Sequence, residues 1–185
     1  NISHLYEIHN AKSFWFVMGP EVNYENQCRT EALLSFVREK NLSDSYELIY
    51  TGFEVVDGRN TFIRLYEEVQ AGKVALPDAV ICANDNLAVG FLAEAELKGL
   101  SAPKDFLITG FDDLDKARYF KPRISTVSYV REDIAEMCVD IFLRLWKGEA
   151  VDKESYIESY PIFWESCGCE SPIIVNERTQ LKHQI

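Results

Sequence analysis

Polar and aromatic side chains follow four short apolar segments of this chain, at the point where each segment ends. They are Asn23, Tyr24 and Arg29 after the first segment, Gly52 and Phe53 after the second, Asn84 and Asp85 after the third, and Phe111, Asp112 and Asp113 after the fourth. Carboxylates accept hydrogen bonds from vicinal hydroxyls, an arginine fork donates to oxygen atoms, and an aromatic ring covers the C–H side of a sugar. The set therefore suits a polyhydroxylated small molecule.

Each of these groups also has a purely structural alternative. Asp85 is favoured as the N-cap of the following helix, because Asn-Asp precedes an apolar run there. Arg29 can equally form surface ion pairs with Glu25 or Glu31. The aspartates after the fourth segment can cap a short helix that begins near Leu114. These alternatives stay open from the residues alone.

The aspartates Asp112, Asp113 and Asp115 also resemble the carboxylate clusters that hold Mg²⁺ in phosphoryl-transfer enzymes. However, no lysine or hydroxyl nucleophile stands at another strand end in the matching role. The chain also has no glycine-rich phosphate loop and no Gly-x-Ser-x-Gly nucleophile motif. We therefore expect a binding protein without a cofactor rather than an enzyme, with a magnesium-dependent phosphoryl-transfer enzyme as the alternative.

Three of the five cysteines lie in apolar patterns, where a reduced thiol behaves as a small hydrophobe, and we expect them in the core. They are Cys28, Cys82 and Cys138. The remaining pair, Cys167 and Cys169, forms a Cys-Gly-Cys motif that could bind a soft metal, but two thiolates make only half of a zinc site. The histidines are expected elsewhere, with His4 and His9 in the first helix and His183 in the tail. We thus expect no metal site within one chain, although an oligomer could supply the missing ligands.

The first two thirds of the sequence alternate short apolar strands with amphipathic helices. The pattern predicts strands over residues 14–18, 46–50, 79–83 and 106–109, and helices over 26–40, around 62–69, and over 86–98. Such an alternation predicts an α/β fold with a parallel, doubly wound sheet. In sheets of this kind, ligands bind beyond the carboxyl ends of the strands, where the groups described above are placed.

The last third is less regular. A strand is predicted over 124–129, and a near-ideal apolar stripe predicts a helix over 134–145 that ends at Gly148. A last strand over 156–164 is interrupted by Pro161, which indicates an edge position or a bend. Beyond Cys169 the apolar pattern fades. We therefore expect residues 1–169 to form the ligand-binding domain and 170–185 to be a tail or linker.

Composition limits the class of protein. The 185 residues are 47% hydrophobic, enough for one sizeable core or two small lobes, and the formal net charge is -11. A surface so acidic repels phosphate backbones and anionic lipid, so this chain alone is not expected to bind DNA or a membrane. There is neither a signal-peptide pattern nor an apolar run near the roughly 20 residues that span a bilayer. We expect a cytoplasmic protein.

Several motifs resemble, in sequence and in spacing, the lac/gal repressor (LacI/GalR) family. The matching segments are Pro-Asp-Ala-Val-Ile-Cys-Ala-Asn-Asp-Asn-Leu-Ala at 77–88, Ile-Thr-Gly-Phe-Asp-Asp at 108–113 and Tyr-Phe-Lys-Pro-Arg-Ile-Ser-Thr-Val at 119–127. The resemblance covers about residues 1–169. It implies a periplasmic-binding-protein-like clamshell of type I, which binds sugars, nucleobases or related metabolites between two lobes and relays lobe closure to DNA-binding headpieces. The positions similar to ligand-contacting ones are Arg29, Phe53, Asn84, Asp112 and Tyr24.

The sequence also departs from this family pattern. It opens at what resembles the first helix of the C-terminal lobe, so the headpiece and most of the N-terminal lobe have no counterpart. The helix over 134–145 would normally pack on that lobe, and its stripe must be covered otherwise, which predicts a homodimer. The Ser-Cys-Gly-Cys extension at 166–169 resembles sensor modules that precede diguanylate cyclases or histidine kinases. A signalling output of that kind is therefore the alternative to a transcriptional one.

Overall fold

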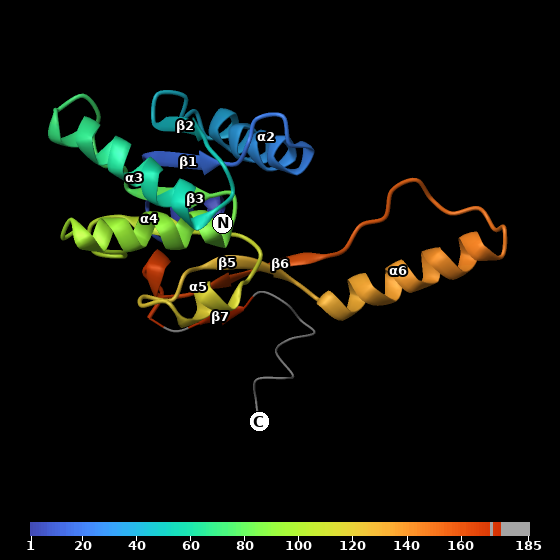
Figure 1. Cartoon of the computed structure of the whole chain (residues 1–185). Helices are drawn as coiled ribbons and strands as arrows, with labels where there is room; N and C mark the ends of the chain where they lie inside the picture. Colours follow the sequence, from blue (N-terminus) through green and yellow to red (C-terminus); the bar gives the residue numbers. More distant parts are fainter. Residues whose placement is uncertain (171, 175–185) are drawn as a thin grey trace.

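The computed structural model describes residues 1–170 and 172–174 and contains a four-stranded and a three-stranded sheet (Figure 1). In chain order the elements are α1 (Ile2–Glu7), β1 (Phe14–Met18), α2 (Tyr24–Glu39), β2 (Tyr46–Tyr50), α3 (Val55–Gln70), β3 (Ala79–Cys82), α4 (Asp85–Leu97), β4 (Leu107–Thr109), α5 (Asp115–Tyr119), β5 (Thr126–Tyr129), α6 (Arg131–Trp146), β6 (Ser159–Phe163), the 3-10 helix η1 (Glu165–Cys167) and β7 (Ile173–Ile174). No described helix is long and apolar enough to cross a membrane.

The larger sheet is parallel throughout and has the strand order β2-β1-β3-β4. β1 lies in its middle, with Phe16 opposite Leu48 on one side and Ile81 on the other. Each strand is joined to the next by a helix, as parallel pairing requires. The prediction of a parallel, doubly wound sheet is therefore confirmed, and all four carboxyl ends lie at the same edge.

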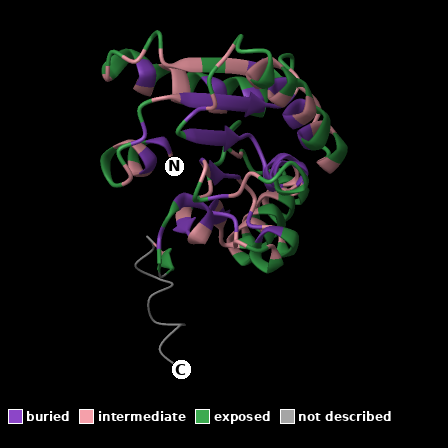
Figure 2. Cartoon of the chain, turned by 90° about the vertical axis from the view of Figure 1, so that its left-hand side faces the viewer, coloured by how far each residue is buried: buried purple, intermediate pink, exposed green. Residues whose placement is uncertain are grey.

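Helices cover both faces of this sheet. On one face α3 and α4 pack together, and Phe62 of α3 meets Phe91 of α4 edge to face, with ring centroids 5.1 Å apart. On the other face α1 packs on α2 through Tyr6 and Phe36. The strands and the helix faces that point toward them hold most of the buried residues (Figure 2). This part of the chain, residues 1–125, is called the sheet lobe.

Two glycines allow α3 and α4 to approach at backbone distance. A Cβ atom added to Gly90 would lie 1.9 Å from the carbonyl oxygen of Val55, and one added to Gly58 would lie 2.2 Å from that of Leu87. Neither position can carry a side chain unless the helices move apart. The close approach fixes the starts of α3 and α4 relative to each other, and both starts lie at the carboxyl edge of the sheet.

A second part of the molecule projects away from the sheet lobe (Figure 1). The chain leaves along β5, forms α6 and returns along β6, which pairs antiparallel with β5. Residues 130–158 are called the arm, and none of them is buried. The predicted helix over 134–145 is confirmed as the central part of α6, but none of the residues of its apolar stripe is buried. Large side chains left exposed there are Val139, Phe142, Leu143, Leu145 and Trp146.

Several expectations about the elements need correction. α2 begins at Tyr24 rather than at residue 26, because Asn23 caps it by accepting a hydrogen bond from the Asn26 amide at 2.9 Å. The predicted strand over 156–164 is β6, which is the middle strand of its sheet and not an edge. Pro161 is tolerated there because, among the described strands, it is paired on one side only. It lies opposite Val127 of β5, whereas β7 pairs with Ile162 and Phe163, the two residues that follow Pro161.

Two of the three cysteines expected in the core are exposed. Cys82 is buried in β3 as predicted, but Cys28 and Cys138 are exposed. α2 buries a polar stripe that includes Asn26 and Thr30 instead of the face that carries Cys28, and Cys138 lies on the arm.

β7 lies within the segment 170–185 expected to be a tail, while residues 171 and 175–185, His183 among them, lie outside the described residues. The tail stays a prediction.

Candidate functional site

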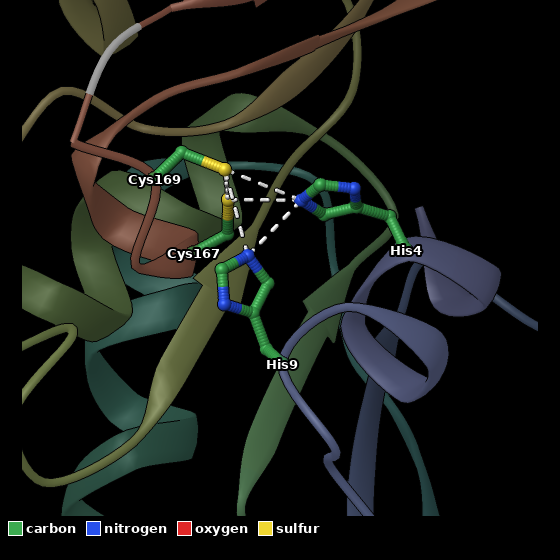
Figure 3. Close-up of side chains that lie close together, drawn as sticks. All are labelled: His4, His9, Cys167 and Cys169. Atoms are coloured by element: carbon green, nitrogen blue, oxygen red, sulfur yellow. Dashed lines mark hydrogen bonds between the residues drawn. The ribbon is translucent and has the colours of Figure 1, made fainter.

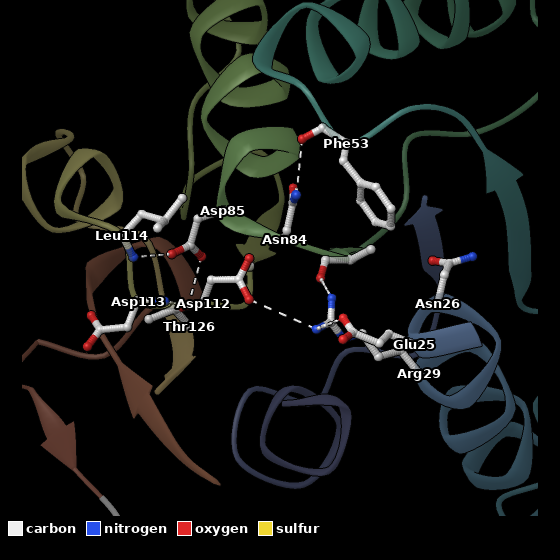
Figure 4. A network of polar contacts seen from close by, with 12 residues as sticks. Glu25, Asn26, Arg29, Phe53, Asn84, Asp85, Asp112, Asp113, Leu114 and Thr126 are labelled. Atoms are coloured by element: carbon white, nitrogen blue, oxygen red, sulfur yellow. Dashed lines mark hydrogen bonds and ion pairs between the residues drawn. The ribbon is translucent and has the colours of Figure 1, made fainter. Parts of the chain in front are cut away.

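The strand-end residues singled out from the sequence come together at the carboxyl edge of the larger sheet (Figure 4). Arg29 comes from α2, Phe53 from the loop before α3, Asn84 from the start of α4 and Asp112 from the loop after β4. Their side chains form two groups. One joins α2 to the loop after β4, and the other joins the loop before α3 to α4.

Arg29 holds the first group together. Its guanidinium donates a hydrogen bond to the Ala83 carbonyl at 2.9 Å and lies 4.1 Å from the ring centre of Phe111. It also forms ion pairs with Glu25 at 3.6 Å and with Asp112 at 3.9 Å. The surface pair with Glu25 weighed as an alternative is thus present, but it accompanies three contacts that aim the guanidinium at the strand ends. About a quarter of the Arg29 side chain stays exposed.

Asp112 lies in a backbone conformation that a non-glycine residue rarely adopts, with φ at 102°. Its amide donates to the Val127 carbonyl at 3.0 Å, which fixes the turn. Burial raises the pKa of the Asp112 carboxyl, and the nearby Arg29 acts in the opposite direction. A carboxylate held in a constrained turn, facing a cation and partly open to solvent, is suited to accept hydrogen bonds from a ligand.

Asn84 and Phe53 form the second group. The Asn84 side chain accepts a hydrogen bond from the Leu87 amide at 2.9 Å, as the N-cap of α4, and donates one to the Phe53 carbonyl at 3.0 Å. Both ends of this amide therefore have partners within the chain. The Phe53 ring packs against Gly19 at the end of β1. Tyr24, the remaining candidate, begins α2 and is 74% exposed, so it lies at the same edge without closing over it.

The interpretation of Asp85 as the helix cap is wrong, because Asn84 caps α4. Asp85 is fully buried and accepts hydrogen bonds from the Leu114 amide at 2.8 Å and from the Thr126 hydroxyl at 2.7 Å. It thereby joins α4 to the segments before α5 and in β5. Burial raises its pKa to about 7, against the hydrogen bonds from Leu114 and Thr126, which lower it. Asp85 is thus a structural link beneath the strand ends.

The three aspartates considered as a magnesium site do not converge. Asp113 is buried, and its carboxylate accepts hydrogen bonds from Arg118 at 2.8 and 2.5 Å and from the Ser128 hydroxyl at 2.7 Å. Asp115 is exposed on α5, and Asp112 turns toward Arg29. Neither Asp112 nor Asp113 caps α5, whose N-cap position is Leu114 without a side-chain hydrogen bond. Because Asp113 is already saturated by its own chain, the cluster offers no shared cation site.

Two hollows lie away from these residues. One, of about 240 Å³, is formed by β1, β2 and α3 around Trp15, Ile49 and Arg64. The other lies between α6 and residues 156–158, next to Met137 and Tyr156. Neither hollow is lined by Arg29, Phe53, Asn84 or Asp112, and Arg29 and Asp112 are both partly exposed at the edge of the sheet lobe.

Sequence reasoning missed a second group of reactive side chains, which is separate from the strand-end residues. His4 and His9 lie beside Cys167 and Cys169 (Figure 3), so the expectation that no histidine stands near the cysteine pair is wrong. His9 also lies after α1 and not within it. Burial, followed by the charge of His9, lowers the pKa of His4 to about 4, and burial raises that of Cys169 to about 12. Only the tertiary fold joins two segments so distant in sequence.

Comparison with known proteins gives consistent matches. Residues 2–167 match the family model described as periplasmic binding protein-like domain. Among curated relatives, the transcriptional repressor PurR of Actinobacillus pleuropneumoniae is 31% identical over 72% of this chain and 39% of its own length. PurR of Pasteurella multocida is 25% identical over 83% of this chain and 44% of its own length. This chain thus spans less than half the length of these relatives.

Solved structures of similar fold include a lac repressor and a regulator of the LacI family. A dimeric lac repressor superposes with a TM-score of 0.78 at 18% identity, covering 89% of this chain and 58% of the repressor. A LacI-family regulator from Enterococcus faecium, solved with bound ribose, gives a TM-score of 0.76 at 22% identity, covering 89% of this chain and 60% of its own. The fold, the matched family and the strand-end motifs agree. The chain therefore belongs to the periplasmic binding protein-like domain family.

Proposed function

We propose that this chain is one lobe of a small-molecule sensor in a lac/gal-type transcriptional regulator, and that the effector binds at the strand ends between Arg29 and Asp112. The observation that carries this proposal is their geometry. The two side chains face each other at 3.9 Å, too far for a close ion pair, and each keeps about a quarter of its surface exposed. Their remaining donors and acceptors are thus available to a ligand at the open edge.

The chemistry of the edge favours an effector with several hydroxyl groups. Arg29 donates, Asp112 accepts, and Phe53 offers an aromatic ring at the same edge (Figure 4), to which Tyr24 adds an exposed ring at the start of α2. Asn84 contributes by fixing the Phe53 loop, since its amide is already used. We infer a sugar, or a metabolite that carries one, which agrees with the ribose bound by the Enterococcus faecium regulator.

Recognition requires a second lobe. The strand ends form an open edge, and most small-molecule sites bury the greater part of their ligand. The arm gives the direction in which a second lobe would lie, because β5 and β6 carry the chain out of the sheet lobe and α6 exposes its apolar side chains there. We propose that closure of two lobes over the effector shifts the population between two states and that this shift is the signal.

The remaining partners follow from the same assignment. We infer a homodimer that works in the cytoplasm and contacts DNA through a headpiece outside this chain, since the relatives named above are repressors and one was solved as a dimer. The chain itself, with its net charge of -11, would not bind DNA. The saturation of Asp113 weighs against the alternative of a magnesium-dependent phosphoryl-transfer enzyme.

The experiment is a ligand screen on a protein in which this lobe is joined to a second lobe. Sugars, nucleosides and nucleobases are tested by thermal shift and then by calorimetric titration. An effector at 100 times its Kd adds about 2.7 kcal/mol, which raises the Tm of a protein of this size by roughly 5–10 °C and that of a larger, two-lobed protein by less. Arg29→Ala and Asp112→Ala should abolish the shift.

The matched control is Arg64→Ala, which removes an exposed arginine on α3 that pairs only with Glu68 among its described partners. It should leave the shift unchanged. If a hit survives both Arg29→Ala and Asp112→Ala, the effector binds elsewhere and the proposed site is wrong. If no sugar or nucleoside binds but another metabolite does, the sensor remains and the ligand class is wrong.

A further inference from the structure

We propose that His4, His9, Cys167 and Cys169 form a mononuclear zinc site that fastens the segment before β1 to the segment after β6. The two pairs are about 160 residues apart in the sequence, yet their four ligand atoms all lie within 4.8 Å of one another (Figure 3). This site is independent of the strand-end site, and the proposal does not depend on the effector function.

The separations between ligand atoms match a tetrahedron. The Nε2 atoms of His4 and His9 are 3.1 Å apart, and the two sulfur atoms are 3.6 Å apart. Three of the four nitrogen to sulfur distances are 3.3, 3.5 and 3.8 Å, and the fourth, between His9 and Cys167, lies within 4.8 Å. Zinc with its usual bonds to nitrogen and sulfur requires edges of about 3.3 Å between nitrogens and about 3.8 Å between sulfurs. Five of the six edges are therefore close to those of a zinc tetrahedron, and a zinc ion fits at the centre once the His9 and Cys167 side chains shift by up to about an ångström.

The surroundings hold the ligands in place. The His4 ring stacks on Phe163 at 3.6 Å with planes 8° apart, which fixes its orientation. Gly168, between the cysteines, has φ at 93°, and this turn directs both sulfur atoms to the same side. An added Cβ there would lie 3.2 Å from Nδ1 of His9, so glycine also makes room for the histidine.

The ligand set selects the metal. Two sulfur and two imidazole nitrogen ligands in a tetrahedron are typical of zinc. A two-iron cluster with two cysteines and two histidines would place each pair on a different iron. Here Cys169 lies 3.3 Å from His4 and 3.5 Å from His9, which is as close as the members of each pair lie to each other, and this suits a single ion. On binding, each thiol releases its proton to solvent, and the two thiolates neutralise the charge of Zn²⁺.

The first test measures metal directly on the whole chain, purified under reducing conditions and mixed with a slight excess of zinc sulfate. After desalting, we expect one zinc ion per chain by elemental mass spectrometry. Cys169→Ser and His9→Gln should each reduce retained zinc at least tenfold. Cys28→Ser, which removes an exposed thiol on α2, is the matched control and should retain one zinc ion.

Cobalt provides a second readout that does not depend on whether the variants fold. One equivalent of Co²⁺ added to the wild-type chain should give the intense visible absorption of a tetrahedral ion and a thiolate-to-cobalt charge-transfer band. Zinc should displace both. A Cys167–Cys169 disulfide that persists in reductant would overturn the proposal. It would be detected as a loss of two hydrogen masses per chain and by peptide mapping under non-reducing conditions. Absence of retained zinc together with an octahedral cobalt spectrum would overturn it as well.

Discussion

Two helices of equal length illustrate the difference between the sheet lobe and the arm. α3 and α6 both have 16 residues and both carry an apolar stripe. α3 buries Phe62 and Leu65 against the sheet and α4, whereas no residue of α6 is buried. An amphipathic pattern thus predicts a helix and the face that packs against a partner, but it does not identify the partner. The stripe on α6 indicates a partner outside the described chain.

A pair of matched truncations tests most directly whether α3 is packed more firmly than α6. Phe62→Ala in the sheet lobe removes a fully buried ring and should lower the free energy of unfolding by about 3–5 kcal/mol. Phe142→Ala on α6 removes a ring that is 60% exposed and should change it by less than about 0.5 kcal/mol. Urea unfolding followed by circular dichroism measures both. Equal losses would mean that α6 is packed in solution as firmly as α3.

The pH dependence of stability tests the contact between the sheet lobe and β5, which leads into the arm and which Asp85 binds. Burial raises the pKa of Asp85 from 3.8 to about 7, with Asp112 and Asp113 adding to the rise. The folded chain therefore holds this proton over a range in which the unfolded chain has lost it. Its contribution to stability is full below about pH 4 and is lost as the pH rises through about 7, by at most about 4 kcal/mol.

Asp85→Asn removes this titration, keeps an oxygen that accepts from the Leu114 amide, and places an N–H group where the Thr126 hydroxyl oxygen can accept it. The free energy of unfolding of the wild-type chain should fall relative to that of the variant between pH 5 and pH 8. Asp140→Asn is the control, because Asp140 is exposed on the arm, and its difference from wild type should stay flat. A flat difference for Asp85→Asn as well would show that the folded carboxyl titrates as it does in the unfolded chain.

The smallest expected effect on stability is also the most informative about the arm. Measured at a concentration low enough for the wild-type chain to be monomeric, Phe142→Asp should leave the free energy of unfolding within about 0.5 kcal/mol of wild type, since the site is exposed in one chain. It should nevertheless abolish self-association, which we expect through the apolar stripe of α6. Sedimentation velocity over a range of concentrations measures this. If the variant associates as wild type does, the dimer forms through another surface.

The sequence predicted the sheet lobe well because its signals are local. Four apolar strands separated by amphipathic helices leave few topologies, and the short loops bring the strand ends together. Arg29 and Asp112 were therefore expected at one edge, and the structure joins them. The role of Asp85 was not predicted, because its partners Leu114 and Thr126 come from segments whose position depends on the whole fold.

The cysteines show the limit of reasoning from periodicity. Cys28 and Cys138 follow helical apolar patterns, yet α2 turns polar groups inward and α6 has no partner among the described elements. The group around Cys167 was missed for a different reason. A His-x4-His pair and a Cys-x-Cys pair are each a recognisable half of a metal site, but nothing local shows that the two halves meet.

The contact between α3 and α4 has a consequence for engineering. Because Gly58 and Gly90 lock the two helices at backbone distance, and Asn84 ties the Phe53 loop to α4, these two strand ends form one rigid block. Arg29 and Asp112 lie outside it and reach each other through side chains alone. A library designed to change the ligand of the proposed effector site should therefore vary Arg29, Asp112 and Tyr24 and leave Asn84 intact.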